Sequence, residues 1–140
     1  MRGHGVSQRR RQSSNGSRSC GPNHLSKPDI GSAKFRNWEH EIGNLAKSPN
    51  VSCKLSGLVT QAQWESWTAD QLRPYAYIAL DAFGPGRVMF GSYWPVCLVA
   101  ASYDTTLQLA HDLTDPLTGP EKDMVFGGTA ARIYRLEAQP

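Results

Sequence analysis

Two short apolar runs constrain the fold of this chain more than any other feature. Residues 50–56 and 87–91 each form a brief apolar stretch that ends at a glycine, and a helical pattern at residues 70–83 lies between them. A strand, a helix and a second strand in this order form a βαβ unit, in which the crossover is right-handed and the strands are parallel. We therefore predict an α/β fold in which these two runs are adjacent parallel strands covered by helices.

Helical patterns surround the two predicted strands. Residues 33–47 place apolar side chains at steps of three and four, which predicts a helix with one apolar face, formed by Phe35, Trp38, Ile42 and Leu45. Residues 61–68 are expected to form a loop or a short helix. For helix 70–83 we expect Asp70 as the N-cap, because this choice leaves Pro74 within the first turns.

The last part of the chain predicts three more helices. Residues 102–113 form a helical pattern with a one-sided apolar set, Tyr103, Leu107, Ala110 and Leu113. Thr118 and Glu121 have the spacing of a capping box, which starts the next helix. Gly127 and Gly128 are expected to end that helix, and Thr129 is expected to cap a final helix that runs to Leu136.

Charge divides the chain near residue 22. Residues 1–22 carry five arginines, no acidic residue and many serines and glycines, so we predict a disordered basic tail followed by a domain at residues 23–140. The arginines at 9–11 could contact nucleic acid, but a solvated tail is the favoured interpretation, and a nucleic-acid partner is not expected. No apolar run has the length of a membrane span or the form of a secretory signal, which favours a cytoplasmic protein without a membrane partner.

Cysteine usage argues against a disulfide framework. The three cysteines, Cys20, Cys53 and Cys97, are an odd number and include no C-x-x-C pair, which also argues against a thiolate zinc site. Cys53 alternates with Val51 and Leu55 along a predicted strand. We therefore expect it to be a buried, unreactive thiol.

Four segments together resemble a known family. Residues 90–96 read FGSYWPV, residues 50–57 read NVSCKLSG, residues 126–134 read FGGTAARIY, and residues 23–28 read NHLSKP. In this order and spacing they resemble the amidohydrolase-related family of the metal-dependent hydrolase superfamily, which includes fuconolactonases and rhamnonolactonases. The resemblance implies a (β/α)8 TIM barrel, and residues 50–57 and 90–96 resemble its seventh and eighth strands.

The length of the chain limits what the resemblance implies for its fold. A closed barrel of this type needs about 250 residues, and the chain has 140. We therefore expect an incomplete barrel made of carboxyl-terminal βα repeats. Such a sheet leaves strand edges unpaired, so self-association through the open sheet edge is expected.

The resemblance implies catalytic positions at His24 and Tyr93. Relatives place histidines and an aspartate at strand ends, where they hold a divalent metal such as zinc or manganese or position water. In this chain Tyr93 stands at the aspartate position, and a phenol is mostly protonated at neutral pH and a poor metal ligand. The sequence has no His-x-His pair, and His40 and His111 are expected on exposed helix faces. We expect no metal or other cofactor in this chain, although full-length relatives could hold one.

Substrate-binding positions are expected at Lys54, Ser56 and Trp94. Strand alternation places Lys54 and Ser56 on one face, where they could hydrogen-bond substrate oxygens; pairing of Lys54 with a nearby acid is the alternative. Trp94 could stack on a sugar ring together with Trp64 and Trp67, although aromatic side chains beside loops often only pack.

Two classes of function remain open from the sequence. The first is a hydrolase that acts on a small-molecule sugar lactone, as the resemblance implies, with activity impaired by the residue at position 93. The second is a truncated, non-catalytic remnant or isoform that serves as a binding or interaction domain. Whether the chain is an enzyme is left undecided, because the family is hydrolytic but His-x-His and the catalytic aspartate are absent from the 140 residues.

Overall fold

The computed structural model describes residue 25, residues 28–30 and residues 34–136. In chain order the elements are α1 (Phe35–Ala46), β1 (Cys53–Leu55), α2 (Leu58–Gln61), α3 (Ala69–Phe83), η2 (Pro85–Arg87), β2 (Val88–Phe90), η3 (Val96–Val99), α4 (Tyr103–Leu113), α5 (Gly119–Asp123), η4 (Met124–Gly128) and α6 (Thr129–Tyr134). The predicted disordered tail, residues 1–22, lies outside the described residues. Within them, no helix is long and apolar enough to cross a bilayer.

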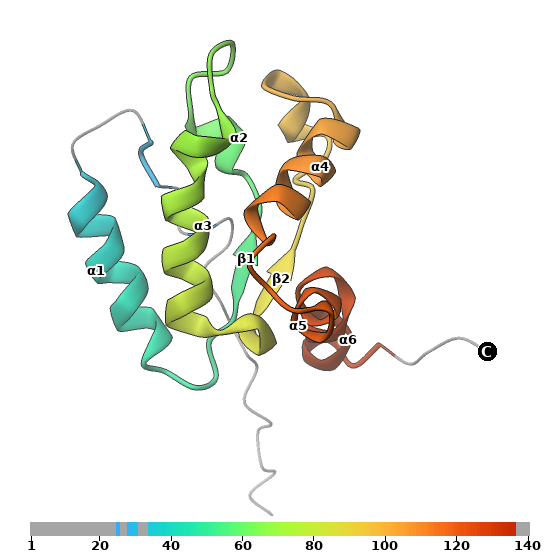
Figure 1. Ribbon diagram of the computed structural model, residues 1–140. Helices are drawn as coiled ribbons and strands as arrows, with labels where there is room; N and C mark the ends of the chain where they lie inside the picture. The colour runs from blue at the N-terminus through green and yellow to red at the C-terminus, as the bar shows by residue number, and fades with distance from the viewer. Residues whose placement is uncertain (1–24, 26–27, 31–33, 137–140) are drawn as a thin grey trace, which may run out of the picture.

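The two predicted strands form a parallel pair. Cys53 pairs with Val88, Lys54 with Met89 and Leu55 with Phe90, and α3 connects β1 to η2 and β2 (Figure 1). The βαβ prediction is therefore confirmed. Both strands are only three residues long, shorter than the predicted runs, and Arg87 belongs to the 3-10 helix η2 and not to β2.

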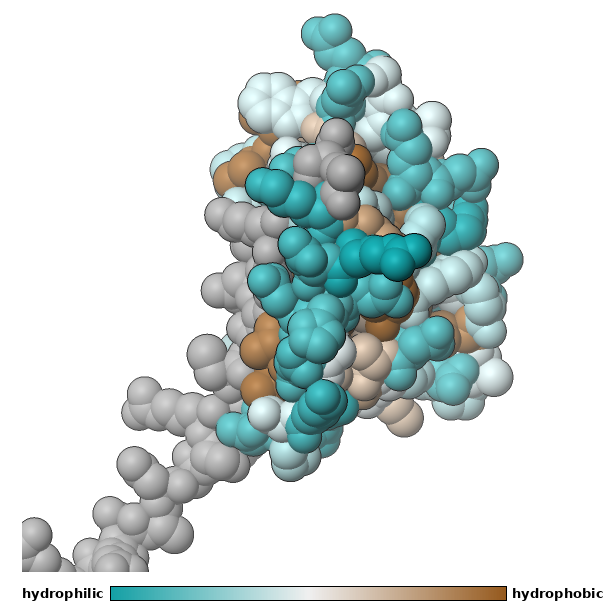
Figure 2. All heavy atoms as spheres, turned by 90° about the vertical axis from the view of Figure 1, so that its left-hand side faces the viewer, coloured by the Kyte–Doolittle hydropathy of each residue, from teal (hydrophilic) through white to brown (hydrophobic). Residues whose placement is uncertain are grey.

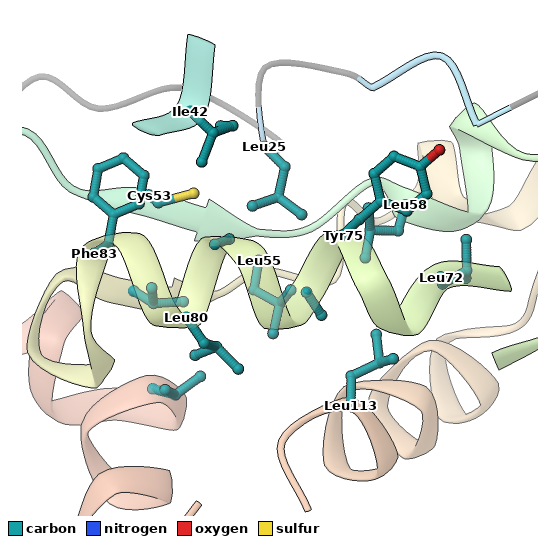
Figure 3. Close-up of a cluster of buried hydrophobic side chains, with 14 of the residues drawn as sticks. Leu25, Ile42, Cys53, Leu55, Leu58, Leu72, Tyr75, Leu80, Phe83 and Leu113 are labelled. Carbon is teal, nitrogen blue, oxygen red and sulfur yellow. The ribbon is translucent and has the colours of Figure 1, made fainter. Parts of the chain in front are cut away.

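The hydrophobic core lies between β1, α1 and α3. Side chains from β1 and α3 meet in Figure 3, where Cys53 and Leu55 on the strand lie beside Leu80 and Phe83 on the helix. Burial of these side chains is the main source of stability for a domain of this size. Burial also raises the pKa of the Cys53 thiol to about 12, so this cysteine is the buried, unreactive residue that was expected.

Helix α1 is amphipathic, as predicted. Trp38 and Ile42 are buried, and the Trp38 indole N–H donates to the carbonyl of Leu25 at 2.8 Å. Phe35 packs its ring against Tyr75 on α3, with 5.0 Å between the ring centroids. Leu45, expected on the same face, is 38% exposed near the end of the helix. Figure 2 shows that the surface over this side of the molecule is largely hydrophilic.

Helix α3 begins one residue earlier than predicted. The N-cap is Thr68 and not Asp70, because the Thr68 hydroxyl accepts from the Gln71 N–H and the Gln71 amide accepts from the Thr68 N–H. This reciprocal capping box satisfies two backbone donors that Asp70 would leave unpaired. Pro74 still lies near the start of the helix, and Gly84, at φ 73°, ends it.

Two predictions for the last helices are wrong. Gly127 and Gly128 do not end a helix; they belong to η4, a π-helical turn that continues from α5 into α6. Thr129 is not a cap but a helical, buried residue whose hydroxyl donates to the Pro85 carbonyl at 3.0 Å. The helix ends at Tyr134, two residues before the predicted end. The predicted capping box of Thr118 and Glu121 is confirmed.

Helix α4 buries two of the four residues predicted for its apolar face, Ala110 and Leu113. Its buried residues are Thr106, Leu109, Ala110 and Leu113, whereas Tyr103 is 45% exposed. The predicted residues were chosen because they are apolar and lie at helical spacing. Thr106 can be buried because its hydroxyl donates to the Ser102 carbonyl at 2.9 Å, which satisfies its polar group within the helix.

Candidate functional site

The two strands end side by side, as the sequence predicts. The N–H of Gly91 donates to the carbonyl of Leu55 at 3.2 Å, which extends the pairing one residue beyond β2. A side-chain carbon at position 91 would lie 3.3 Å from Cβ of Ser56. The approach is therefore close enough to favour glycine, and it sets the distance between the loops that follow β1 and β2. Ser56 is buried at this point.

A small pocket lies beneath these strand ends. It measures about 20 Å³ and is lined by residues of β1, α2, β2 and α4, including Ser56, Gly91 and Thr106. This volume is enough for one water molecule and far below the several hundred Å³ that enclose a small organic ligand. A sugar-sized molecule would therefore have to bind over the strand ends and not within this pocket.

Tyr93 follows the end of β2 in a left-handed backbone conformation. Its φ is 58°, a region that Asn and Asp enter more readily than bulky residues. Its carbonyl accepts from the Cys97 N–H at 2.9 Å, which closes the loop onto η3. The backbone at this position therefore suits the aspartate that the family resemblance places there, although the residue is a half-buried tyrosine.

Trp94 is the most exposed aromatic residue beside the strand ends. Its side chain is 63% exposed, its backbone N–H donates to the Ser92 hydroxyl at 3.2 Å, and the peptide bond to Pro95 is cis. The other two tryptophans proposed for a cleft lie beyond α2. Trp64 donates to the Thr60 carbonyl at 3.1 Å, and Trp67 donates to the Ala100 carbonyl at 3.0 Å. Of the three, Trp94 presents the largest exposed face at the strand ends.

Lys54 is directed toward α6. Its ammonium nitrogen lies 5.9 Å from the centre of the Tyr134 ring, at cation–π distance. Tyr134 is eighty residues away from Lys54 in sequence. It is neither a substrate oxygen nor a nearby acid, the two partners that the sequence suggested for Lys54. The substrate-binding role of Lys54 therefore stays a prediction, and the contact it makes is with an aromatic ring.

The histidines do not assemble into a site in the part of the chain that is described. His24 lies outside the described residues. His40 is exposed on α1, as expected, and His111 is exposed on α4 with its ring stacked on Phe126, 4.4 Å between centroids. His111 therefore packs against Phe126, a contact that the apolar pattern of residues 102–113 did not indicate.

The described residues do not fit a divalent metal. Across residues 25, 28–30 and 34–136, no three His, Cys, Asp or Glu side chains are placed to share an ion. Cys53 is unsuitable because burial keeps its thiol protonated, and a metal ligand must be a thiolate. The residue at the strand end, Tyr93, is a phenol. No chemical step through a metal is therefore derived for this chain.

Sequence reasoning missed two residues that shape this region. Gly91 is predicted only as the end of a strand, although its close approach to Ser56 sets the distance between the ends of β1 and β2. Arg87 was read as part of a strand, yet its guanidinium donates to four carbonyls that position β1 and β2. No local sequence signal marks this role, because three of the four carbonyls lie 36 to 41 residues earlier in the chain.

Comparisons with known proteins agree with the fold. The family model described as Amidohydrolase matches residues 23–136. An L-fucono-1,5-lactonase of Burkholderia multivorans is 49% identical over 104 residues, which cover 71% of this chain and 35% of the relative. An L-rhamnono-gamma-lactonase of Scheffersomyces stipitis is 26% identical over 134 residues, covering 81% of this chain and 40% of the relative.

Solved structures show the same relationship. The crystal structure of an amidohydrolase from Burkholderia multivorans with bound Zn has a TM-score of 0.79 and 42% identity, covering 82% of this chain and 43% of that one. A putative 2-pyrone-4,6-dicarboxylic acid hydrolase from Pseudomonas putida, at TM-score 0.69 and 18% identity, shares the fold. The chain spans 35% to 43% of the length of these four relatives. With a family model matched over most of its residues, the chain belongs to the amidohydrolase family.

Proposed function

We propose that the chain forms the carboxyl-terminal βα repeats of an amidohydrolase-type barrel. We propose also that a sugar lactone binds at the ends of its two strands. The parallel pairing of β1 and β2, with α3 as the crossover, supports the barrel assignment. The relatives named for their activity are an L-fucono-1,5-lactonase and an L-rhamnono-gamma-lactonase, which supports a sugar lactone as the ligand.

One observation supports this proposal: Ser56, Tyr93 and Trp94, three of the five predicted site residues, follow the ends of the two strands. Ser56 contacts the position of Gly91, and Tyr93 and Trp94 follow Gly91 within three residues. In barrels and open parallel sheets, ligands bind at the carboxyl ends of strands. The exposed indole of Trp94 offers a flat apolar face, suited to the C–H face of a sugar ring.

We propose further that catalysis is impaired in the 140 residues as they stand. Hydrolysis of a lactone needs a group that removes a proton from water, and position 93 carries a phenol in place of the carboxylate that the family resemblance implies there. Tyr93 is also half-buried, and its carbonyl accepts a hydrogen bond from the Cys97 N–H. His24 remains a proposed second member of the site.

An interaction domain is the second candidate function. The observation that favours it is the set of large apolar side chains that remain exposed after β2, including Trp94 and Leu98 at 63% and 54%. An exposed cluster of this kind is typical of a binding surface for another protein. Within the described residues the sheet has two strands, and pairing of its outer edges with another copy is a further proposed route to self-association.

Ligand binding tests the first proposal without requiring turnover. We would titrate the chain with L-fuconate, the stable product of L-fucono-1,5-lactone hydrolysis, and follow heat release by calorimetry. Weak saturable binding is expected, and Trp94→Ala should weaken it about tenfold, because aromatic contacts contribute about 0.5–1.5 kcal/mol. Trp64→Ala is the matched control, since Trp64 is an indole of similar exposure, 53%, beyond α2.

Two results would contradict the proposal. If L-fuconate and the lactone show no saturable binding, the strand ends are not a sugar-lactone site. If Trp64→Ala and Trp94→Ala weaken binding equally, the ligand does not bind where the two strands end.

A further inference from the structure

The segment after β2 exposes an unusual density of apolar side chains. Residues 94–103 carry half of the large apolar side chains that are exposed in the described part of the chain, although the segment has only ten residues. Their exposed fractions lie between 44% and 63%, for Trp94, Val96, Leu98, Val99 and Tyr103. We call these five side chains the apolar rim. Single exposed apolar residues are ordinary, whereas a contiguous group marks an interaction surface.

The backbone beneath the apolar rim is fixed by hydrogen bonds. Cys97 is fully buried, and its N–H donates to the Tyr93 carbonyl at 2.9 Å. The Cys97 carbonyl accepts from the N–H groups of Ala100 and Ala101 at 3.0 and 2.9 Å. The Trp67 indole adds a bond to the Ala100 carbonyl at 3.0 Å. The apolar rim is therefore a preformed surface, which lowers the entropy cost of binding.

The apolar rim and the neighbouring helix α2 belong to chain segments without charged side chains, which are bordered by Lys54 and Arg87 before them and by Glu65 and Asp104 after them. Residues 88–103 contain no Asp, Glu, Lys or Arg, and neither do residues 55–64, whose helix α2 contacts η3. The first charges that follow these two segments, Glu65 and Asp104, are both acidic. A nucleic acid or an acidic membrane needs basic groups, which these segments do not carry.

We propose that the apolar rim binds the same surface of a second copy of this chain. In a two-fold contact, a side chain near the axis lies close to its own copy, so a charge there would meet a charge of the same sign. A surface without charges avoids that repulsion, and identical apolar side chains are mutually compatible. The absence of charge over residues 88–103 is therefore compatible with contact between two copies of this surface.

The size of the apolar rim sets the strength that we expect. Its five partly exposed side chains offer on the order of 400 Å² per copy, about half of the ~800 Å² per partner in a standard interface. The expected dimer is weak and depends on protein concentration. This proposal does not depend on lactone binding, so failure of either proposal leaves the other standing.

Sedimentation velocity of the full chain, over about a hundredfold range of concentration, tests the proposal. The weight-average sedimentation coefficient should rise with concentration for the unmodified chain. Leu98→Asp should weaken association at least about tenfold, because it places two carboxylates near each other across the two-fold axis. Leu136→Asp is the matched control, since Leu136 is a leucine of similar exposure, 63%, two residues beyond the end of α6. That variant should associate like the unmodified chain.

A mixing experiment makes the test specific for a second copy. Leu98→Lys and Leu98→Asp should each be monomeric, and an equal mixture should recover the dimer because opposite charges now face each other. Circular dichroism verifies that the variants keep their helices, which we expect because Leu98 is more than half exposed. Three results would overturn the proposal: a monomer at every concentration, unchanged association of Leu98→Asp, or a monomer that binds neutral phosphatidylcholine vesicles through Leu98.

Discussion

Arg87 joins three segments that reach the sheet from different directions. Its guanidinium donates to the carbonyls of Ala46 at the end of α1, Ser48 and Val51 between α1 and β1, and Phe83 at the end of α3, at 3.0–3.2 Å. The guanidinium also lies over the Phe83 ring, 5.2 Å from its centre. Replacement of Arg87 by Met keeps much of the apolar stem and removes all four donors, so the variant isolates the polar contribution.

The magnitude follows from these contacts. Each hydrogen bond from a charged donor contributes about 1.5–3 kcal/mol, but the four share one guanidinium that is only half-buried, so water replaces part of what is lost. Helix carbonyls at a C-terminus add a favourable dipole contribution of about 0.3–1 kcal/mol. We therefore expect Arg87→Met to lower the free energy of unfolding by about 3 kcal/mol.

Urea denaturation followed by circular dichroism measures this loss directly. A loss of about 3 kcal/mol corresponds to a fall in Tm of about 12–20 °C for a domain of this size. Arg87→Lys should recover little of the loss, since one ammonium group cannot reach four carbonyls. Arg36→Met, an arginine exposed on α1, is the control and should change stability by less than about 0.5 kcal/mol. Equal effects of Arg87→Met and Arg36→Met would refute the role assigned to Arg87.

Three further predictions rest on single residues. Thr68→Ala should lower the free energy of unfolding by about 1 kcal/mol through loss of the α3 capping box, measured by urea denaturation; no change would contradict the assigned N-cap. Tyr93→Val should cost about 1–2 kcal/mol more than Tyr93→Asn in the same assay, because φ is 58° and a β-branched residue is disfavoured there; equal losses would contradict the assigned backbone. Because the Cys53 pKa is raised to about 12, the folded state keeps a proton that the unfolded state loses above about pH 9. Stability should therefore fall from about pH 9 toward 12, by up to about 1.4 kcal/mol per pH unit more than in Cys53→Ala, and equal slopes would contradict the burial effect.

The sheet and its crossover could be predicted because local signals and topology agree there. Two apolar runs that end at glycine, with a helix between them, leave a parallel pair as the compatible arrangement. The helix boundary was misjudged by one residue because Thr68 and Asp70 are both good N-caps by residue type. The Gln71 side chain decides between them, since it completes a box with Thr68.

The end of the chain could not be predicted because tertiary contacts override local preference. Gly127 and Gly128 are poor helix formers, yet they continue a helix whose next residue, Thr129, is anchored to Pro85 and whose Arg132 donates to Gly86. Those partners lie more than forty residues earlier in the chain. Sequence periodicity gives no information about contacts between residues so far apart in the chain.

The candidate site was predictable only in part. The position of Ser56 beside Gly91 follows from parallel strands of matched length, as the sequence indicated. The contact of Lys54 with the Tyr134 ring joins β1 to the last helix and has no local signature. His24 lies outside the described residues, so its participation in the site remains a prediction.

Hydrolysis itself tests the central claim most directly: that these 140 residues retain the lactone-facing strand ends but not catalysis. The unmodified chain and Tyr93→Asp would be assayed with L-fucono-1,5-lactone, with and without added zinc or manganese, against spontaneous hydrolysis. We predict no rate above background for either protein, because one carboxylate does not supply the positioning that contributes about 7–11 kcal/mol to such reactions. Metal-dependent turnover by the unmodified chain would contradict the account, since it would require Tyr93 and His24 to belong to a working site.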